Sequence, residues 1–170
     1  MVSVDRNFNG VLVDGTTYTM TEDLLVRTSG FTLAPGSGGS GIVWNGNGFG
    51  VPVNSTSWGG LFPCAVTVYN TSVRSGGSTA NFVGWFFKQS VGGTATNCYS
   101  SGGIGQYGGG IFGSGSPGTA RNCYSTGEIN RGGGGIFGSI AKGSAINCYS
   151  TGEINPESGG IFGANTTAIT

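Results

Sequence analysis

The sequence predicts an all-β protein, a right-handed parallel β-helix in which short strands stack turn upon turn. Three observations predict this fold. A sequence unit recurs every 25 positions through the second half of the chain, glycine supplies 37 of the 170 residues, and short runs of β-branched or small residues separate glycines and asparagines at fixed offsets. Helical repeats run longer, about 33 to 47 residues, and need Ala, Leu, Glu and Lys, which are scarce here. We expect two or three short parallel strands in each turn.

The composition excludes several other classes of protein. Disorder does not fit, because 36% of the residues are apolar and 11% are aromatic. Collagen does not fit, because the glycines do not recur at every third position. Seven basic and seven acidic residues give a formal net charge of zero without a basic cluster, so we expect neither nucleic acid nor an anionic membrane surface as a partner. No window approaches the roughly 18 apolar residues of a membrane span, so we expect no membrane insertion.

Two four-residue motifs define the repeat, and each recurs at a step of 25 positions. The first is Asn-Cys-Tyr-Ser, at 97–100, 122–125 and 147–150. The second is Gly-Ile-Phe-Gly, at 110–113, 135–138 and 160–163. Of the 19 positions from Ala120 to Gly138, 15 hold the same amino acid 25 positions later, which excludes chance.

The period divides the chain into three stretches. Residues 1–40 do not follow it, and we expect them to form capping strands with a tight hairpin at Asp14-Gly15. Residues 41–94 carry diverged copies of the Gly-Ile-Phe motif at uneven spacing, which predicts irregular early turns. Residues 95–170 hold the regular repeats.

The period also leads to an expectation for the C-terminal end of the coil. The chain stops at Thr170, where the next Asn-Cys-Tyr turn would begin. A solenoid needs its last open edge to be protected. We therefore expect this end to be covered, by further chain beyond residue 170 or by another subunit.

Successive turns of a β-helix lie about 4.8 Å apart, so residues 25 positions apart are expected to stack into ladders. An asparagine ladder fits a corner, because Asn tolerates the left-handed backbone conformation and its side-chain amide can form a hydrogen bond to the equivalent Asn of the next turn. Alternation beyond the corner places Cys123 inward and Tyr124 and Glu128 outward, while the phenylalanines fit either side of the wall. The expected structural ladders are Asn97, Asn122 and Asn147; Cys98, Cys123 and Cys148; and Ile111, Ile136 and Ile161.

An outward aromatic stripe is expected at Tyr99, Tyr124 and Tyr149. Stacked rings stabilise neighbouring strands, which is one role for this stripe. The other is a surface contact for sugar rings or for another protein, because aromatic residues are enriched at recognition sites. The three tryptophans lie in the irregular part, where they fill the core or line a groove: Trp44, Trp58 and Trp85.

These motifs resemble the GLUG-type glycine-rich repeat, whose pattern is Gly-Gly-Leu-Val-Gly, a short variable loop, and Asn-(Cys/Ser)-Tyr-(Ala/Ser)-Thr-Gly. The chain has Gly-Gly-Ile-Phe-Gly at 109–113 and Asn-Cys-Tyr-Ser-Thr-Gly at 122–127, and both recur 25 positions later. It differs in having Ile-Phe for Leu-Val. The resemblance implies a β-helix of surface proteins, often adhesin-like, or of shafts that flank protease domains, and it implies no catalytic residues.

The cysteines and the absence of histidine give little indication of catalytic or metal-binding chemistry. The chain has no histidine, which excludes a Ser or Cys nucleophile with a His base and a His-ligated metal. The cysteine ladder lacks the Cys-x-x-Cys spacing of a zinc site, and stacked cysteines have parallel Cβ vectors, a poor geometry for a disulfide. We expect them to be reduced and buried as small apolar residues, with Cys64 outside the ladder. No catalytic, cofactor-binding or metal-binding residues are expected.

Glu128 and Glu153 are the only carboxylates in register. Their expected spacing is near the roughly 5 Å that separates the carboxylates of a retaining glycosidase. The same spacing belongs to every ladder of a β-helix, so we expect a solvated pair. A catalytic pair or a weak cation site is the alternative.

These observations favour a non-enzymatic structural or adhesive segment of a surface or secreted protein, of a cell or a virus particle. Carbohydrate or another protein is the expected partner, and no cofactor is expected. The alternative is a carbohydrate-binding or carbohydrate-cleaving β-helix, such as a lyase or a tailspike-like enzyme. Its charged residues would gather in one groove, whereas here they are scattered. Ice binding is a third alternative, but of the outward threonines it needs in a regular array only Thr126 and Thr151 comply.

Overall fold

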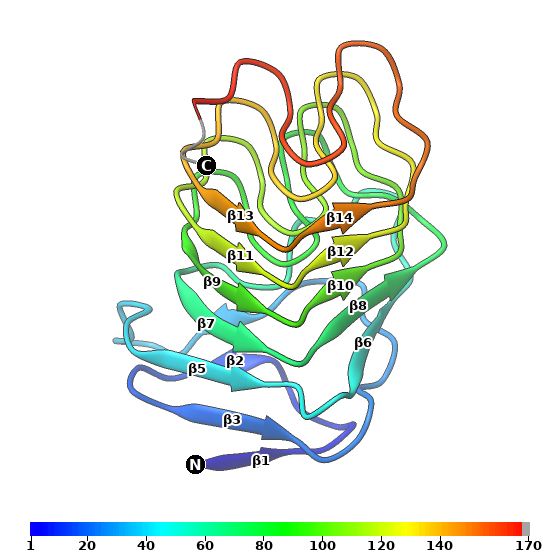
Figure 1. Cartoon of the computed structure of the whole chain (residues 1–170). Helices are drawn as coiled ribbons and strands as arrows, with labels where there is room; N and C mark the ends of the chain where they lie inside the picture. The colour runs from blue at the N-terminus through cyan, green and yellow to red at the C-terminus, as the bar shows by residue number, and fades with distance from the viewer. Residues whose placement is uncertain (168–170) are drawn as a thin grey trace.

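The computed structural model describes residues 1–167, so the end of the chain at Thr170 lies outside the described residues. In the described part the chain is all-β, contains no helix, and coils as a parallel solenoid of about six turns. The predicted fold class is therefore confirmed. Figure 1 shows the turns stacked in chain order, with the N-terminus at one end of the coil and the last turn at the other.

Parallel sheets form the wall of the solenoid. The largest sheet stacks β1 (Val2–Val4), β3 (Thr17–Met20), β5 (Ile42–Asn45), β7 (Val66–Tyr69), β9 (Gly93–Thr96), β11 (Thr119–Arg121) and β13 (Ser144–Ile146). The second sheet stacks β6 (Gly50–Val53), β8 (Ser72–Ser75), β10 (Tyr99–Ser100), β12 (Tyr124–Ser125) and β14 (Tyr149–Ser150). Two further strands pair with each other, β2 (Val11–Leu12) and β4 (Thr32–Leu33). Single parallel bridges, such as Phe112 to Phe137, extend the rest of the wall.

The register is regular in the second half of the chain and uneven in the first. Ala95, Ala120 and Ala145 stack on one another at steps of 25 positions. Earlier turns have different lengths: Thr17 pairs with Val43, Ile42 with Val66, and Val66 with Gly93, which are steps of 26, 24 and 27 positions. The weaker repeat signal before residue 95 reflects these unequal turns.

Inward side chains fill the solenoid as ladders. The rings of Phe87, Phe112 and Phe137 stack with centroids 4.5 and 4.8 Å apart, and all three are buried. The sequence does not predict whether these phenylalanines face the core or the solvent. The structure places them in the core. In the irregular turns buried tryptophans fill the core, and the indole N–H groups of Trp58 and Trp85 each donate to a backbone carbonyl at 3.0 Å.

Glycine is required where two turns approach most closely. A Cβ atom at Gly127 would collide with the carbonyl group of Gly102, which lies one turn away. Gly152 has the same relation to the carbonyl group of Gly127. The glycine of the Thr-Gly pairs at 126–127 and 151–152 is therefore dictated by contact between backbones.

The hairpin expected at Asp14-Gly15 is wrong. The strands on either side, β2 and β3, do not pair with each other: β2 pairs with β4, and β3 pairs with β1 and β5, all in parallel. The turn is instead a corner of the solenoid. The Asp14 carboxylate accepts the backbone N–H groups of Gly38, Gly39 and Ser40 at 2.8, 2.8 and 3.0 Å. Residues 1–40 thus belong to the first turns of the coil.

We predict that the hydrogen bonds to Asp14 at this corner make the stability of the fold depend on pH. The N–H groups of Gly38 and Ser40 are the main cause of a pKa of Asp14 below its usual value. A carboxyl group whose pKa is lower when folded contributes stability above its unfolded pKa, about 3.9, and loses it as the pH falls through the folded value. Asp14→Asn should lower the melting temperature at pH 7, and the difference from wild type should shrink below about pH 4.

Circular dichroism melts from pH 7 to pH 2 measure this difference. Asp5→Asn is the matched control, because the Asp5 carboxylate accepts one local N–H group, from Asn7. It should change the melting temperature less than Asp14→Asn does. Equal melting temperatures for wild type and Asp14→Asn at pH 7 would contradict the role of this corner.

Candidate functional site

A ladder of asparagine amides runs along one corner of the solenoid. Asn97, Asn122 and Asn147 have φ angles of 53°, 52° and 53°, in the left-handed region that Asn tolerates. The Nδ2 group of Asn122 donates to Oδ1 of Asn97 at 3.1 Å, and that of Asn147 donates to Oδ1 of Asn122 at 3.4 Å. Each amide therefore bonds its copy in the preceding turn.

The amide ladder begins one turn earlier than the sequence indicates. The Nδ2 group of Asn97 donates to Oδ1 of Asn70 at 3.0 Å, and Asn70 has the same left-handed backbone, with φ 53°. Two sequence features hide this member. It lies 27 positions before Asn97, and Thr-Ser follows it in place of Cys-Tyr.

Beside the amides, three tyrosines form an outward stack on the second sheet. The ring centroids of Tyr99 and Tyr124 are 4.8 Å apart, those of Tyr124 and Tyr149 are 5.0 Å apart, and the planes differ by 3° and 4°. Burial, followed by the neighbouring tyrosines, raises the pKa of Tyr124. Because the rings face one another, the sides of the stack present ring edges, and open ring faces occur only at its two ends.

The tyrosine stack ends at β8, where a groove opens. Tyr99 pairs with Ser72 in the strand register, so a small hydroxyl side chain stands where the next ring would be. A groove of about 440 Å³ lies at this point. It is lined by Asn47, Gly48, Asn70, Thr71, Ser72, Asn97 and Tyr99. No motif in the sequence marks this groove, because it depends on which residue lies beneath Tyr99.

The cysteine and isoleucine ladders lie in the core. Cys98 and Cys123 are buried, Cys148 in the last turns is half-buried, and all four cysteines, Cys64 included, are free thiols. The stacked Cys123 thiol and burial hold the pKa of Cys148 above its usual range. These thiols therefore act as small apolar groups with weak bonds to carbonyls. The isoleucine ladder is fully buried at Ile111 and Ile136 and half-buried at Ile161.

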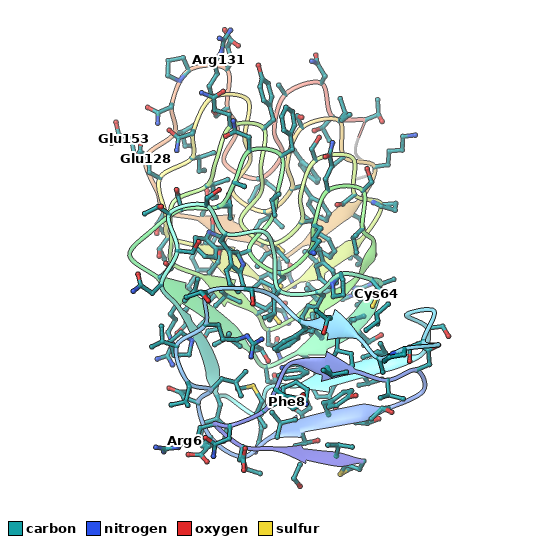
Figure 2. The ribbon with its side chains drawn as sticks, turned by 180° about the vertical axis from the view of Figure 1, so that it is seen from behind. Arg6, Phe8, Cys64, Glu128, Arg131 and Glu153 are labelled. Carbon is teal, nitrogen blue, oxygen red and sulfur yellow. The ribbon has the colours of Figure 1, made fainter. Side chains whose placement is uncertain are left out.

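Glu128 and Glu153 lie next to each other on the outer surface, as Figure 2 shows. Oε1 of Glu128 accepts a hydrogen bond from Nδ2 of Asn155 at 2.7 Å, in a setting open to water. Within residues 1–167, no group of three His, Cys, Asp or Glu side chains is placed to hold a metal ion. Neither carboxylate lines any of the grooves described for this part of the chain.

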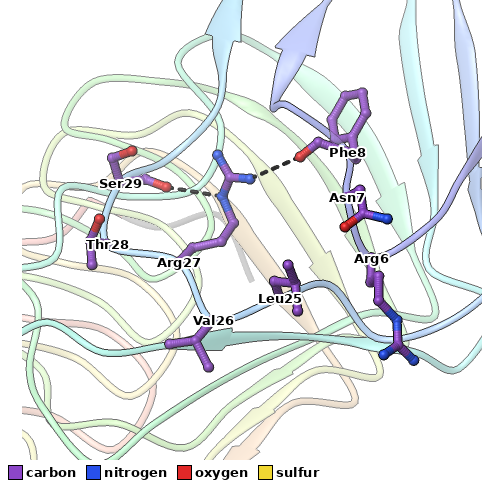
Figure 3. A pocket seen from close by; sticks show the side chains of 8 residues that line it. All are labelled: Arg6, Asn7, Phe8, Leu25, Val26, Arg27, Thr28 and Ser29. Carbon is purple, nitrogen blue, oxygen red and sulfur yellow. Dashed lines mark hydrogen bonds between the residues drawn. The ribbon is translucent and has the colours of Figure 1, made fainter.

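A second hollow, of about 310 Å³, lies near the N-terminus (Figure 3). Its central group is the half-buried guanidinium of Arg27, which donates to the carbonyls of Ser29 at 3.1 Å and Phe8 at 3.4 Å. The same guanidinium lies 4.8 Å from the centre of the Phe31 ring, and burial lowers its pKa. At the edge of the hollow, Arg6 forms an ion pair with Glu22 at 2.6 Å. Both arginines are thus engaged in holding the first turns together.

The three tryptophans are buried and line none of the grooves described above, and the amide ladder and the tyrosine stack are the surface ladders that run through three or more turns of residues 1–167 with bonded or stacked side chains. No helix in residues 1–167 has the length and apolar character needed to cross a membrane. No protein-family model, curated protein or solved structure matches this chain.

The amide ladder makes a testable contribution to stability. We predict that Asn122→Gly lowers the free energy of unfolding by about 1 kcal/mol. The substitution removes the exposed hydrogen bonds between side-chain amides but leaves the left-handed backbone unstrained. Asn122→Ala should cost about 1 kcal/mol more, since alanine is strained at that backbone angle. Urea denaturation of both variants measures the difference. The role of backbone strain is wrong if the glycine variant is as unstable as the alanine variant.

Proposed function

We propose that this chain is a non-enzymatic, rigid segment of a surface or secreted protein, and that its outward amide and tyrosine ladders form an adhesive face. The observation that carries the proposal is the pairing of these two ladders on one side of the coil. Asn97 and Tyr99 lie two residues apart, both outward, and each continues through the next two turns. Tyrosine and asparagine are residues that recognition surfaces use for contact area and hydrogen bonding.

Stacking supports the structural part of the proposal. Each asparagine hydrogen-bonds to, and each tyrosine packs against, the equivalent residue of the next turn. The surface groups are therefore held in a fixed array with little conformational freedom. An array of this kind presents the same chemistry at regular intervals and can engage an extended partner at several points. The resemblance to GLUG-type repeats, which occur in adhesin-like surface proteins, favours the same function.

The charged groups support a role without catalysis. Within residues 1–167, three ion pairs join Arg6 to Glu22, Arg74 to Asp23, and Arg131 to Glu157, and all of them are on the surface. The remaining carboxylates with a regular spacing, Glu128 and Glu153, stand in water rather than in a groove. An acid and base pair of a glycosidase needs a site that holds the scissile bond between the two carboxylates.

A glycan and protein adhesion assay tests this function. Beads coated with the chain are expected to adhere to an array of glycans or of surface proteins, while no new reducing ends appear in the solution. The variant Glu128→Gln/Glu153→Gln should adhere as wild type does. Release of sugar products that this double variant abolishes would contradict the proposal and support the carbohydrate-cleaving alternative. The absence of adhesion to every glycan and protein would also contradict it.

A further inference from the structure

The groove beneath Tyr99 is a gap in the outward ladder of the second sheet. Tyr149, Tyr124 and Tyr99 occupy one position in three successive strands, and Ser72 and Gly50 occupy the same position in the next two. Two rungs in succession therefore lack a ring. One face of the Tyr99 ring closes the groove at one end, and Ser72 forms its floor.

Polar side chains surround this gap, and two of them keep a group free for a ligand. The amide of Asn97 donates to Asn70, but within residues 1–167 the Nδ2 group of Asn70 donates to no acceptor. The hydroxyl of Ser72, on the groove floor, also has no hydrogen bond within those residues. Asn47, exposed on the rim, adds a third polar side chain, and its Nδ2 group donates to the carbonyl of Met20 at 3.4 Å. The groove thus offers both donors and acceptors beside an aromatic face.

The charge of the groove narrows the class of ligand. None of the seven lining residues is Asp, Glu, Lys or Arg. The guanidinium of Arg74 lies against Gly50 and is paired with Asp23, while its Nε is buried and has no hydrogen-bond partner within residues 1–167. Because Asp23 neutralises this charge and the Nε group is enclosed, an anionic sugar or an acidic peptide would find no accessible positive charge here, so a neutral ligand fits best.

We propose that the groove binds one ring of a neutral saccharide. The ring would occupy the place of the missing tyrosine, with its C–H face packed on Tyr99 and its hydroxyl groups bonded to Asn70, Asn97 and Ser72. A volume of about 440 Å³ lies within the usual range of small-ligand sites. A saccharide uses the aromatic face and the amides together, whereas an aromatic side chain of a protein would leave the amides unpaired. This inference rests on the proposed adhesive function and names its ligand.

The decisive variant fills the gap with the residue that the repeat uses above it. Ser72→Tyr should add a fourth ring to the stack and occupy the groove. The strands β10, β12 and β14 of the same sheet hold tyrosine at the equivalent positions 99, 124 and 149, so the variant is expected to fold, with a cooperative melt near that of wild type. Tyr99→Ser leaves the groove open but removes the aromatic ring on which the sugar would pack. Tyr149→Ser is the matched control, because it removes a ring from the far end of the same stack.

Saturation-transfer NMR and calorimetry with glucose, galactose, mannose, N-acetylglucosamine and their short oligomers provide the measurement. Wild type should bind at least one of these sugars, with saturation passing from tyrosine protons to one face of the sugar ring. Ser72→Tyr and Tyr99→Ser should each weaken binding at least about tenfold, the equivalent of about 1.4 kcal/mol, while Tyr149→Ser should not change it.

The outcomes separate this inference from the proposed function. If wild type adheres to the arrays but binds none of the neutral sugars, or if Ser72→Tyr binds them as tightly as wild type does, the groove is not the saccharide site and the adhesive function stands. Preference for uronate oligomers or for tyrosine-containing peptides would overturn the inference in the same way. Product release in the adhesion assay would instead overturn the function.

Discussion

Every turn of this solenoid finds its backbone hydrogen-bond partners in a neighbouring turn. The backbone N–H group of Ile104 donates to the backbone carbonyl of Glu128 at 2.7 Å, and that of Ile129 donates to the backbone carbonyl of Glu153 at 2.8 Å, so the same bond recurs one turn later. The strands are only two to four residues long, and strands this short are unstable alone. Stability therefore depends on keeping one turn in register with the next, and this requirement determines which side chains the surface and the core accept.

Because equivalent residues of successive turns stack on one another, the fold favours side chains that attract an identical neighbour. Amides bond amides, phenol rings stack on phenol rings, and thiols pack as apolar groups, whereas like charges repel. This explains the low charge of the chain, 8% of residues. In the tyrosine stack each ring covers the one before it, so a ring face is open only at an end of the stack. A groove forms where a ladder is interrupted, as it is where Ser72 lies beneath Tyr99.

The period made much of the fold predictable. Alternation around Cys123, Tyr124 and Glu128 follows directly from strand geometry, and the structure shows it. The corner at Asp14 was mistaken for a hairpin, because its turn residues are local while the hydrogen bonds that determine its role come from residues 38–40. Asn70 and the groove were missed for a related reason. A step of 27 positions separates them from the regular repeat, and only pairing in three dimensions reveals it.

The central claim is that register between successive turns, at a step of 25 positions, holds the molecule together, and deletion of one turn tests it most directly. Removal of residues 122–146 takes out one full period and joins Arg121 to Asn147, which preserves every ladder. Removal of residues 122–145 leaves one residue too many, and a slip of one residue reverses inside and outside. In urea denaturation the full-period deletion should unfold cooperatively, with a free energy of unfolding at least about 2 kcal/mol above that of the shorter deletion. Equal stability of the two deletions would contradict the account.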